Sequence, residues 1–338
     1  MSVNLSSHTT FKVGGPASEF FIATDEREAI RLVSEADEKK IPVLILGGGS
    51  NILVADRGFS GRVIKMAMTG DIRAVDSCSG GMITIGAGRD WDDFVAECVS
   101  KGIVGVESLS GIPGTVGAAP IQNIGAYGHD LSEVIARVRT FDRVAKEITS
   151  FSQSESGFTY RSSRFKESPD RYLILDVTFQ MKQGELSLPI LYPELAEAID
   201  IEEERRAPLG IVREAVLAIR SRKGMVLDAR DPDTNSAGSF FMNPIVDPSQ
   251  VPDGATSWPV ENGRVKISAA WLLENAGISK GMKLGNAAIS LKHVLALTNP
   301  GSASASEIKA LADLCQRKVR ENYGIELERE VRLLGFAQ

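Results

Sequence analysis

The sequence predicts a protein of two or three domains in which helices and strands alternate along the chain. Its 338 residues are long for a single domain. Hydrophobic residues make up 43% of the chain and charged residues 24%, which is ordinary for a globular protein. Helical and alternating apolar patterns both occur, and three glycine-rich loops interrupt them. These loops are where we expect the function to lie, because glycine allows backbone shapes and close approaches that a Cβ forbids.

Residues 1 to about 68 have the pattern of a small α/β unit. Thr24 can cap a helix that carries Ala29, Ile30 and Val33. The helix is followed by an apolar run from Ile41, a polar turn and a second apolar run, Ile52–Val54.

The first glycine loop is the turn between these runs, Gly47-Gly48-Gly49-Ser50-Asn51. A Rossmann fingerprint needs a helix directly after its glycines, because the helix N-terminus holds the pyrophosphate. Ile52–Val54 is too short and too rich in β-formers for that helix. We therefore expect a strand, a turn and a strand, with phosphates held by the turn amides.

The second loop, Gly86-Ala87-Gly88, follows a short strand pattern at Met82–Ile85. It precedes a run whose apolar residues are spaced as on one face of a helix, namely Trp91, Phe94, Val95, Cys98 and Val99. A strand, a glycine loop and a helix are predicted here.

The third loop is the long segment from Ser108 to Gly128, which has neither a helical nor a strand period. It contains Ile112, Val116 and Ile121, which a solvated linker would lack. Its backbone is therefore expected to be a binding surface. Together the three loops favour a nucleotide-type cofactor.

Further strands are predicted at Val138–Phe141 and Tyr172–Thr178. Beyond Lys223 the pattern changes to a polar run (228–233) and then to two helices. One spans Ser268 to Asn275 and ends at Gly277; the other spans Ser304 to Tyr323, with a Ser304–Glu307 capping box and a closing Gly324. A final strand is expected from Ile325 to Leu334.

Composition excludes several classes of function. A net charge of −6 and a pI near 5.4 argue against a nucleic-acid partner. No apolar run reaches the length of a membrane span, and no signal peptide is visible, so a cytoplasmic enzyme is expected. No disulfide framework or metal site is predicted, because the cysteines and histidines are few and scattered: Cys78, Cys98, Cys315, His8, His129 and His293.

Three polar residues have both a chemical and an ordinary interpretation. Ser239, between Gly238 and two phenylalanines, is equally consistent with a hydroxyl at the wall of an apolar pocket and with a turn serine. Glu330 lies on the polar face of the closing strand, and a solvated face is the more probable interpretation of that pattern alone. Arg161 is suited to binding a carboxylate through two hydrogen bonds, although arginines are common on surfaces.

Six blocks of sequence together resemble the UDP-N-acetylenolpyruvoylglucosamine reductase family. In chain order they are GGGSN (47–51), GAG (86–88), IPGTVGAAPIQNIGAYG (112–128), YR (160–161), AGSFFMNP (237–244) and LEREVRLLG (327–335). The similarity runs from His8 to Gly335, and the third and fifth blocks are highly specific. It covers nearly the whole chain.

The resemblance implies an α+β fold of the vanillyl-alcohol-oxidase type (PCMH type), with FAD between two lobes and a C-terminal α/β substrate-binding domain. The implied divisions are 1–68 with 326–338 for the first FAD-binding lobe, 69–222 for the second, and 223–325 for the substrate domain. The first lobe is discontinuous because the closing strand returns to it.

The resemblance also implies the residues that contact FAD. They are Gly47, Gly48, Gly49, Ser50, Asn51, Gly86, Gly88, Gly111, Gly114, Gly117, Ala118, Gln122, Asn123, Gly125, Tyr127 and Gly128. The turn from Gly47 to Asn51 would lie at the pyrophosphate.

The implied reaction has two halves. NADPH gives hydride to the flavin and leaves, and UDP-N-acetylglucosamine enolpyruvate then takes its place and is reduced to UDP-N-acetylmuramate, a peptidoglycan precursor. By resemblance, Ser239 donates a proton to C2 of the substrate, Arg161 binds its carboxylate, and Glu330 assists from the opposite side. Tyr160, Tyr192, Lys223, Asn243 and His293 are the implied substrate contacts, and Tyr192 indicates the subtype with a tyrosine loop over the substrate.

Two alternatives remain at this stage. The chain could be another flavin-dependent oxidoreductase of the same fold, acting on an alcohol or a sugar. It could also be a nucleotide-binding module without chemistry, which would not need Ser239, Arg161 and Glu330 together. We expect a monomer that binds neither nucleic acid nor membranes.

Overall fold

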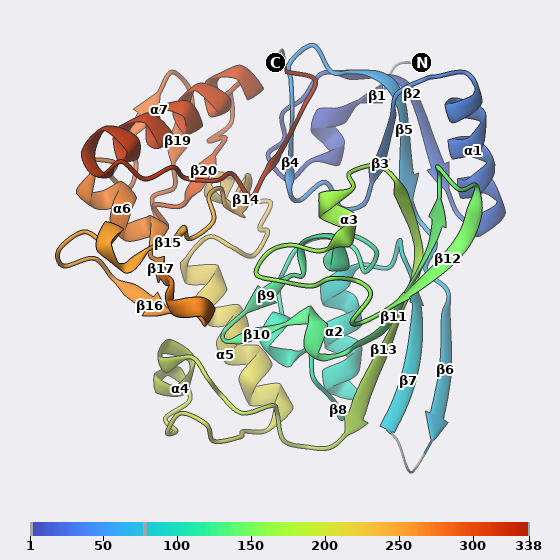
Figure 1. Ribbon diagram of the computed structural model, residues 1–338, viewed down its shortest axis with the longest axis horizontal. Coiled ribbons are helices and arrows are strands. Elements are labelled where there is room, and N and C mark those ends of the chain that lie inside the picture. Colours follow the sequence, from blue (N-terminus) through green and yellow to red (C-terminus); the bar gives the residue numbers. More distant parts are fainter. Residues whose placement is uncertain (1–2, 77–79, 337–338) are drawn as a thin grey trace. The chain divides into compact units, whose positions relative to one another are not determined.

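A computed structural model describes residues 3–76 and 80–336, and its elements are labelled in Figure 1. The chain divides into two compact units, each built from separate stretches of sequence. Unit 1 comprises Met1–Val3, Ala17–Gly48 and Ser60–Ser221; unit 2 comprises Asn4–Pro16, Gly49–Phe59 and Arg222–Gln338. The three functional parts inferred from the resemblance divide the chain in a different way, and they stay a prediction.

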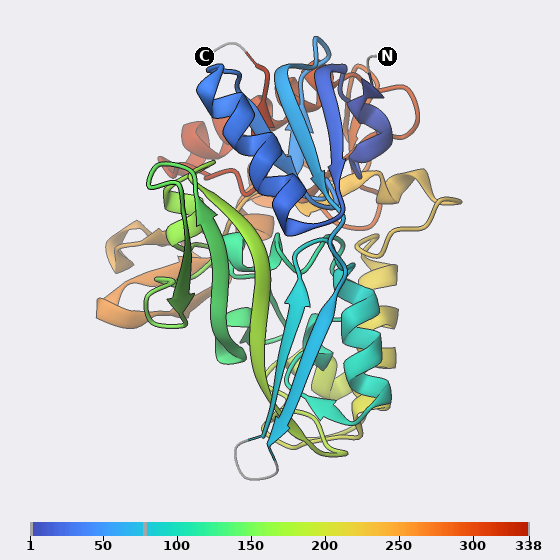
Figure 2. The same cartoon turned by 90° about the vertical axis from the view of Figure 1, so that its right-hand side faces the viewer.

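Unit 1 begins with a sheet that contains β2 (Pro16–Ala23), β5 (Phe59–Met66) and β3 (Val43–Leu46) in that order. β3 and β5 run parallel, and α1 (Glu26–Glu38) packs beside them (Figure 2). The α/β pattern predicted for this region is confirmed.

The cap of α1 is one residue later than predicted. The carboxylate of Asp25 accepts a hydrogen bond from the Glu28 amide at 2.9 Å, so Asp25 and not Thr24 is the N-cap. Thr24 instead donates its amide to the Glu28 carboxylate at 3.2 Å. An aspartate is the better cap here because its charge also opposes the positive end of the helix dipole.

The second sheet of unit 1 is antiparallel along the order β12-β11-β13-β7-β6. The strands are β6 (Asp71–Asp76), β7 (Gly80–Gly86), β11 (Ile135–Asp142), β12 (Glu147–Ser152) and β13 (Tyr172–Gln183). The short β8 (Ile103–Val104) pairs with the end of β13. The three strands predicted in this stretch are confirmed, and each is longer than its apolar pattern.

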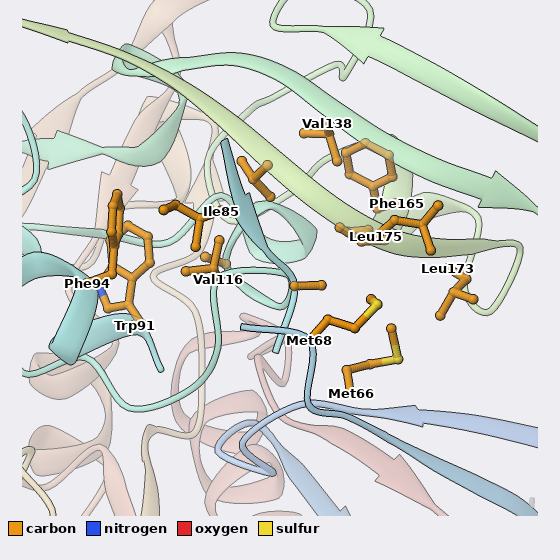
Figure 3. Packing of buried hydrophobic residues seen from close by; sticks show 14 of the residues in the cluster. Met66, Met68, Ile85, Trp91, Phe94, Val116, Val138, Phe165, Leu173 and Leu175 are labelled. Carbon is orange, nitrogen blue, oxygen red and sulfur yellow. The ribbon is translucent and has the colours of Figure 1, made fainter. Parts of the chain in front are cut away.

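The core of unit 1 is one continuous apolar cluster that joins both sheets (Figure 3). Trp91 and Phe94 of α2 (Trp91–Ser100) pack against Phe179, with ring centroids 6.2 and 5.0 Å from it. The helix predicted after Gly88 is therefore confirmed. A smaller cluster lies between α4 (Pro193–Ala198) and α5 (Leu209–Arg222). α3 (Arg164–Glu167) is a single turn.

Among the described residues, unit 2 contains three small sheets and two α-helices, and two of the sheets lie in its C-terminal part. The first sheet has the order β14 (Ser236–Ser239), β20 (Ala296–Thr298), β19 (Ala287–Ile289) and β18 (Lys283–Leu284). The second contains β15 (Ile245–Val246), β17 (Val265–Ile267) and β16 (Ser257–Pro259). The helices are α6 (Ala269–Asn275) and α7 (Ala305–Tyr323), and they match the two predicted ones.

The ends of α7 follow the predicted chemistry. The Ser304 and Glu307 side chains form the capping box, and Gly324 has a left-handed backbone with φ of 65°. Within the described ranges, no helix has the length and apolar character that crossing a bilayer requires.

The closing strand is shorter than predicted. Only β21 (Arg332–Leu334) is in a sheet, where it pairs in parallel with β4 (Ile52–Val54). Ile325, Leu327 and Val331 are buried, so the predicted alternation of side chains holds. The backbone of 325–331, however, lies outside the sheets: the Gln316 side chain donates to the Leu327 carbonyl, and a single antiparallel bridge joins Arg329 to Phe241. Alternating apolar residues show which side chains are buried, but they do not show where the backbone hydrogen bonds go. The alternation therefore predicted a strand that is longer than the one observed.

The strand, turn and strand predicted around Gly47 to Asn51 is present, but the two strands do not pair with each other. β3 belongs to a sheet of unit 1, whereas β4 pairs with β21 in unit 2.

Candidate active site

Glycines of the first and third loops bring two backbones into direct contact. A Cβ on Gly47 would lie 2.6 Å from the Thr115 hydroxyl oxygen, and one on Gly48 would lie 2.8 Å from the Gly114 Cα. Both distances are too short for a side chain. The glycines are thus required for the two loops to pack together.

The second loop is held in the same way. A Cβ on Gly117 would lie 2.4 Å from the Ala87 Cβ, and one on Gly88 would lie 2.4 Å from the Met68 nitrogen. The Gly117 amide also donates to the Ala87 carbonyl at 2.9 Å. The three glycine loops therefore form one interlocked assembly, although the sequence places them far apart.

The amides of the turn at Gly47 to Ser50 are suited to an anion. Within the described part of the chain, none of these four amides donates a hydrogen bond to a protein acceptor. Consecutive amides without protein acceptors bind phosphate oxygens well. The turn thus fits the pyrophosphate of a dinucleotide cofactor.

The segment after Gly117 is bent by unusual backbone angles. Asn123, Tyr127 and Arg161 all have positive φ, at 42°, 53° and 53°. Positive φ in a residue other than glycine costs conformational energy and is concentrated at functional sites. All three residues are on the predicted site list.

Side chains hold this bend in place. The Asn123 amide donates to the Thr159 carbonyl at 3.2 Å, and its oxygen accepts from the Ser132 amide at 3.0 Å. The Arg161 guanidinium donates to the Gly125 carbonyl at 2.7 Å. Asn123 is thus built into the loop, while Arg161 is oriented by the loop itself.

Two predicted tyrosines meet beside this segment. The rings of Tyr127 and Tyr192 pack edge to face, with centroids 5.5 Å apart and an angle of 89° between the planes. Tyr192 is 40% exposed, so its hydroxyl can reach a ligand. Tyr160, also 40% exposed, lies beside the Arg161 guanidinium at 5.9 Å.

In unit 2 the structure joins three predicted residues that are distant in sequence. Ser239 ends β14, and the next residue, Phe240, accepts a hydrogen bond from the Glu330 amide at 2.9 Å. The Asn51 side chain donates to the Glu330 carbonyl at 3.0 Å, and its own carbonyl accepts from the Arg332 amide at 3.1 Å. Ser239 and Glu330 are therefore held on neighbouring extended segments.

The surroundings of Ser239 explain its local sequence. Phe240 and Phe241 are fully buried and anchor the segment, while Ser239 itself is half-buried. Gly238 has φ of 70°, and a Cβ there would meet no atom within 4 Å. A serine between two buried phenylalanines and an open glycine is consistent with a hydroxyl at the wall of a pocket.

The side chains of Asn243 and His293 each accept a hydrogen bond from a backbone amide. The side-chain oxygen of Asn243 accepts from the Ala269 amide at 2.9 Å, at the start of α6. Nδ1 of His293 accepts from the Leu295 amide at 3.1 Å. Lys223 is half-buried at the start of the C-terminal part of unit 2.

Sequence reasoning missed an ion pair at the base of the long glycine loop. The Asp92 carboxylate accepts from Arg213 at 2.7 and 2.9 Å and from the Gly111 amide at 2.6 Å. Burial would raise the pKa of Asp92, but these hydrogen bonds and the positive charge of Arg213 outweigh it and lower the pKa. No local pattern could pair Asp92 with a partner 121 residues away.

No group of three or more metal-ligating side chains is clustered in residues 3–76 and 80–336. Cys98 and Cys315 are buried, while Cys78 lies outside the described residues.

Two family models match the chain. Residues 17–148 match an FAD binding domain, and residues 231–334 match the C-terminal domain of UDP-N-acetylenolpyruvoylglucosamine reductase. The sequence is 51% identical over 336 residues to the UDP-N-acetylenolpyruvoylglucosamine reductase of Cutibacterium acnes, covering 98% of this chain and 89% of that protein. The chain belongs to this reductase family.

Other members of the UDP-N-acetylenolpyruvoylglucosamine reductase family agree. The Thermobifida fusca reductase is 44% identical, with 99% of this chain and 97% of that protein covered. The crystal structure of the Thermus caldophilus reductase superposes with a TM-score of 0.68 at 27% identity, covering 99% of this chain and 98% of that one.

The predicted fold class is thereby confirmed: an α+β FAD-binding fold of the vanillyl-alcohol-oxidase type, followed by the C-terminal domain of the reductase family. The protein is an FAD-containing oxidoreductase.

Proposed function

We propose that this protein uses NADPH to reduce UDP-N-acetylglucosamine enolpyruvate to UDP-N-acetylmuramate, as a monomer in the cytoplasm. The observation that carries the proposal is the backbone bond that places Ser239 and Glu330 on neighbouring segments. The hydrogen bond from the Glu330 amide to the Phe240 carbonyl, at 2.9 Å, holds a hydroxyl and a carboxylate on adjacent segments. The names of the relatives supply the substrate class.

The three interlocked glycine loops and the segment to Gly128 would hold FAD. The amides from Gly47 to Ser50 would bind its pyrophosphate, because they have no acceptor among the described residues. When bound, FAD accepts hydride from NADPH and supplies it from N5 to C3 of the enol ether. In this proposal, 1–68 with 326–338 and 69–222 are the cofactor lobes, and 223–325 is the substrate part.

Ser239 supplies the proton at C2. Hydride addition at C3 leaves negative charge on C2 and the carboxylate, and this enolate is basic enough to take a proton from an ordinary serine hydroxyl. A positioned proton donor contributes a factor of about 10² to 10⁴ in rate.

Arg161 binds the carboxylate and offsets its growing charge. Its guanidinium is anchored by the Gly125 carbonyl at 2.7 Å, so little conformational freedom remains to be lost on binding. Glu330 assists from the opposite side of the substrate. A guanidinium oriented before the substrate arrives stabilises the developing carboxylate charge without further reorganisation.

The remaining proposed substrate contacts differ in how many of their polar atoms already bind within the protein. Tyr192 and Tyr160 are partly exposed and can turn toward a diphosphate or sugar. Asn243 would use its amide nitrogen, because its oxygen binds Ala269, and His293 would use Nε2, because Nδ1 binds Leu295. Lys223 would pair with a phosphate.

An anaerobic visible spectrum of the purified protein tests the proposal. The expected result is a flavin spectrum that NADPH bleaches and that only the enolpyruvyl sugar nucleotide restores. If another alcohol or sugar reacted with the flavin and this substrate did not, the protein would be a different flavin oxidoreductase. A colourless protein that could not be reconstituted with FAD would instead indicate a nucleotide-binding module without chemistry.

A further inference from the structure

The segment 187–192, here named the strap, leads to Tyr192 and contacts residues 127–129. The rings of Tyr127 and Tyr192 meet at 5.5 Å. A Cβ on Gly128 would lie 2.7 Å from the Leu191 Cβ, and Nε2 of His129 lies 2.8 Å from the Pro189 carbonyl oxygen. Three consecutive residues thus each contact one position of the strap.

His129 is bonded through both ring nitrogens. Nδ1 lies 2.8 Å from a carboxylate oxygen of Glu133, and Nε2 faces the Pro189 carbonyl. A carbonyl and a carboxylate can only accept, and a neutral imidazole can donate through only one nitrogen. Only the protonated ring satisfies both contacts, so the geometry indicates an imidazolium. The side chain is only 5% exposed, so water cannot replace a lost partner easily.

Glu107 anchors the neighbouring position of the strap. This fully buried carboxylate accepts from the Leu188 amide at 2.6 Å and from the Gly105 amide at 2.7 Å. The strap is therefore fastened at two adjacent residues, Leu188 and Pro189, just before Leu191 and Tyr192. On its other side, the Ile190 amide donates to the Arg205 carbonyl at 2.8 Å.

The charged groups around His129 favour its protonated form. Glu133 bonds to its ring, and the negative charge of Glu107 also acts on it. Asp130 is its chain neighbour, and the Arg161 guanidinium lies near Gly125, the residue that pairs with Asp130. Burial would lower the pKa of His129, but the hydrogen bonds to Glu133 and Pro189 and the two carboxylate charges outweigh it and raise the pKa.

We propose that His129 and Glu107 are positioning residues that hold the strap and thereby set the place of the Tyr192 ring. This inference rests on the proposed function, in which Tyr192 contacts the sugar nucleotide. Neither residue touches the substrate; both act through the backbone of 188 and 189. The strap is then fixed at Leu188 and Pro189, and its last residue, Tyr192, carries the hydroxyl that binds the ligand.

The arrangement makes substrate binding depend on pH. Because the folded pKa of His129 is raised, its contribution to strap order is complete below the ordinary pKa and is lost as pH rises through the folded value. Above that pH one ring nitrogen becomes an acceptor and faces an oxygen. The KM for the enolpyruvyl sugar nucleotide should therefore rise with pH, while flavin reduction by NADPH should not follow the same curve.

The first measurement is ¹⁵N NMR of the histidine rings of the holoenzyme. The chain has only three histidines, so His129→Gln assigns the signal of interest. We expect His129 to carry protons on both nitrogens at neutral pH and to titrate above the ordinary histidine range. A ring that titrated at or below that range would overturn the proposal, whether or not the variant folds.

The second measurement combines amide hydrogen exchange with kinetics. In His129→Gln and Glu107→Gln, the Ile190 amide should exchange faster, and the KM for the sugar nucleotide should rise about 10-fold, as expected for one lost hydrogen bond to a charged group. The pH dependence of that KM should disappear in His129→Gln. Glu202→Gln is the matched control, because this carboxylate follows the strap, is 85% exposed and should change neither quantity.

The results separate the two proposals. An unchanged pH profile of KM in His129→Gln would refute the positioning role. If amide exchange in the strap became faster and KM stayed constant, Tyr192 would not be a substrate contact. His129 and Glu107 would then not control KM either. Faster exchange, a raised KM and unaltered flavin reduction together would support both.

Discussion

Ser239 owes its position to its neighbours. Phe240 and Phe241 are buried and fix the chain on one side, and the hydrogen bond from the Glu330 amide to Phe240 fixes it on the other. A serine hydroxyl is a weak acid, so its usefulness depends on where it is held and on how basic the acceptor is.

Replacing Ser239 with alanine tests its role directly. We expect the rate at which the sugar nucleotide re-oxidises reduced flavin to fall by about 10² to 10⁴. Flavin reduction by NADPH should be unchanged, because no proton is delivered to C2 in that half. Stopped-flow absorbance measures both halves separately.

Two controls accompany this experiment. Ser239→Cys keeps an acidic hydrogen and should recover part of the rate, and Ser302→Ala removes an exposed hydroxyl in the same unit and should behave as wild type. An equal loss in both half-reactions of Ser239→Ala would rule out proton donation.

Tyr192→Phe removes only a hydroxyl. The ring should stay against Tyr127, because their edge-to-face packing does not involve the oxygen. We expect the KM for the sugar nucleotide to rise by about 3- to 10-fold, the worth of one hydrogen bond. Steady-state kinetics with flavin reduction as the internal reference measures this, and an unchanged KM would contradict the assignment.

At the scale of elements, the helices and the glycine loops are specified by the sequence in different ways. Helix α7 is specified by side chains that are present: the capping box of Ser304 and Glu307. The glycine loops are specified by side chains that are absent, since Gly117 and Gly88 leave no space for a Cβ.

Gly117→Ala should therefore destabilise the loop assembly. The added Cβ would lie 2.4 Å from the Ala87 Cβ and 3.0 Å from its carbonyl oxygen, and one of the loops would have to move. Overpacking of this kind costs roughly 1 to 3 kcal/mol. We expect a lower unfolding midpoint and weaker FAD retention, measured by thermal denaturation and by fluorescence of released flavin.

Gly210→Ala is the matched control for that variant. Gly210 lies in α5, and a Cβ there would meet nothing within 4 Å. Alanine should stabilise the helix by up to about 1 kcal/mol. Equal losses in the two variants would show that steric contact between the loops is not the cause.

At the scale of the whole molecule, we expect hydrogen-bonded carboxylates to govern how stability responds to acid. In unit 2, burial would raise the pKa of Asp56, but hydrogen bonds from Ser306 and from the Ala305 amide at the start of α7 lower it. In unit 1, Asp92 and Asp142 also have lowered pKa values, the latter chiefly through its bond to Arg171.

A lowered folded pKa contributes stability above the ordinary pKa, and that stability is lost as pH falls through the folded value. We expect the unfolding midpoint to fall steadily below about pH 5. Asp56→Asn should be less stable at pH 7 and should lose less between pH 5 and 3. Scanning calorimetry across pH measures both, and an acid dependence as steep as wild type would exclude Asp56 as a contributor.

Local patterns predicted most of the elements and the chemistry of their ends. The helix after Gly88, the capping box of α7 and the strands of the second sheet of unit 1 depend on residues close in sequence. The errors were also local in origin. Thr24 was the predicted N-cap of α1, but Asp25 is the cap. The closing strand is shorter than predicted, because alternation shows only which side chains are buried.

The sequence by itself determined the family, through the blocks from Gly47 to Gly335, and with it the identity of the residues expected to act. Only the tertiary structure decided which of them meet. The bond between Glu330 and Phe240, the pair of Asp92 and Arg213, and the fastening of the strap by His129 and Glu107 each join distant segments. Such pairings depend on how loops close and pack, and no periodicity along the chain encodes them.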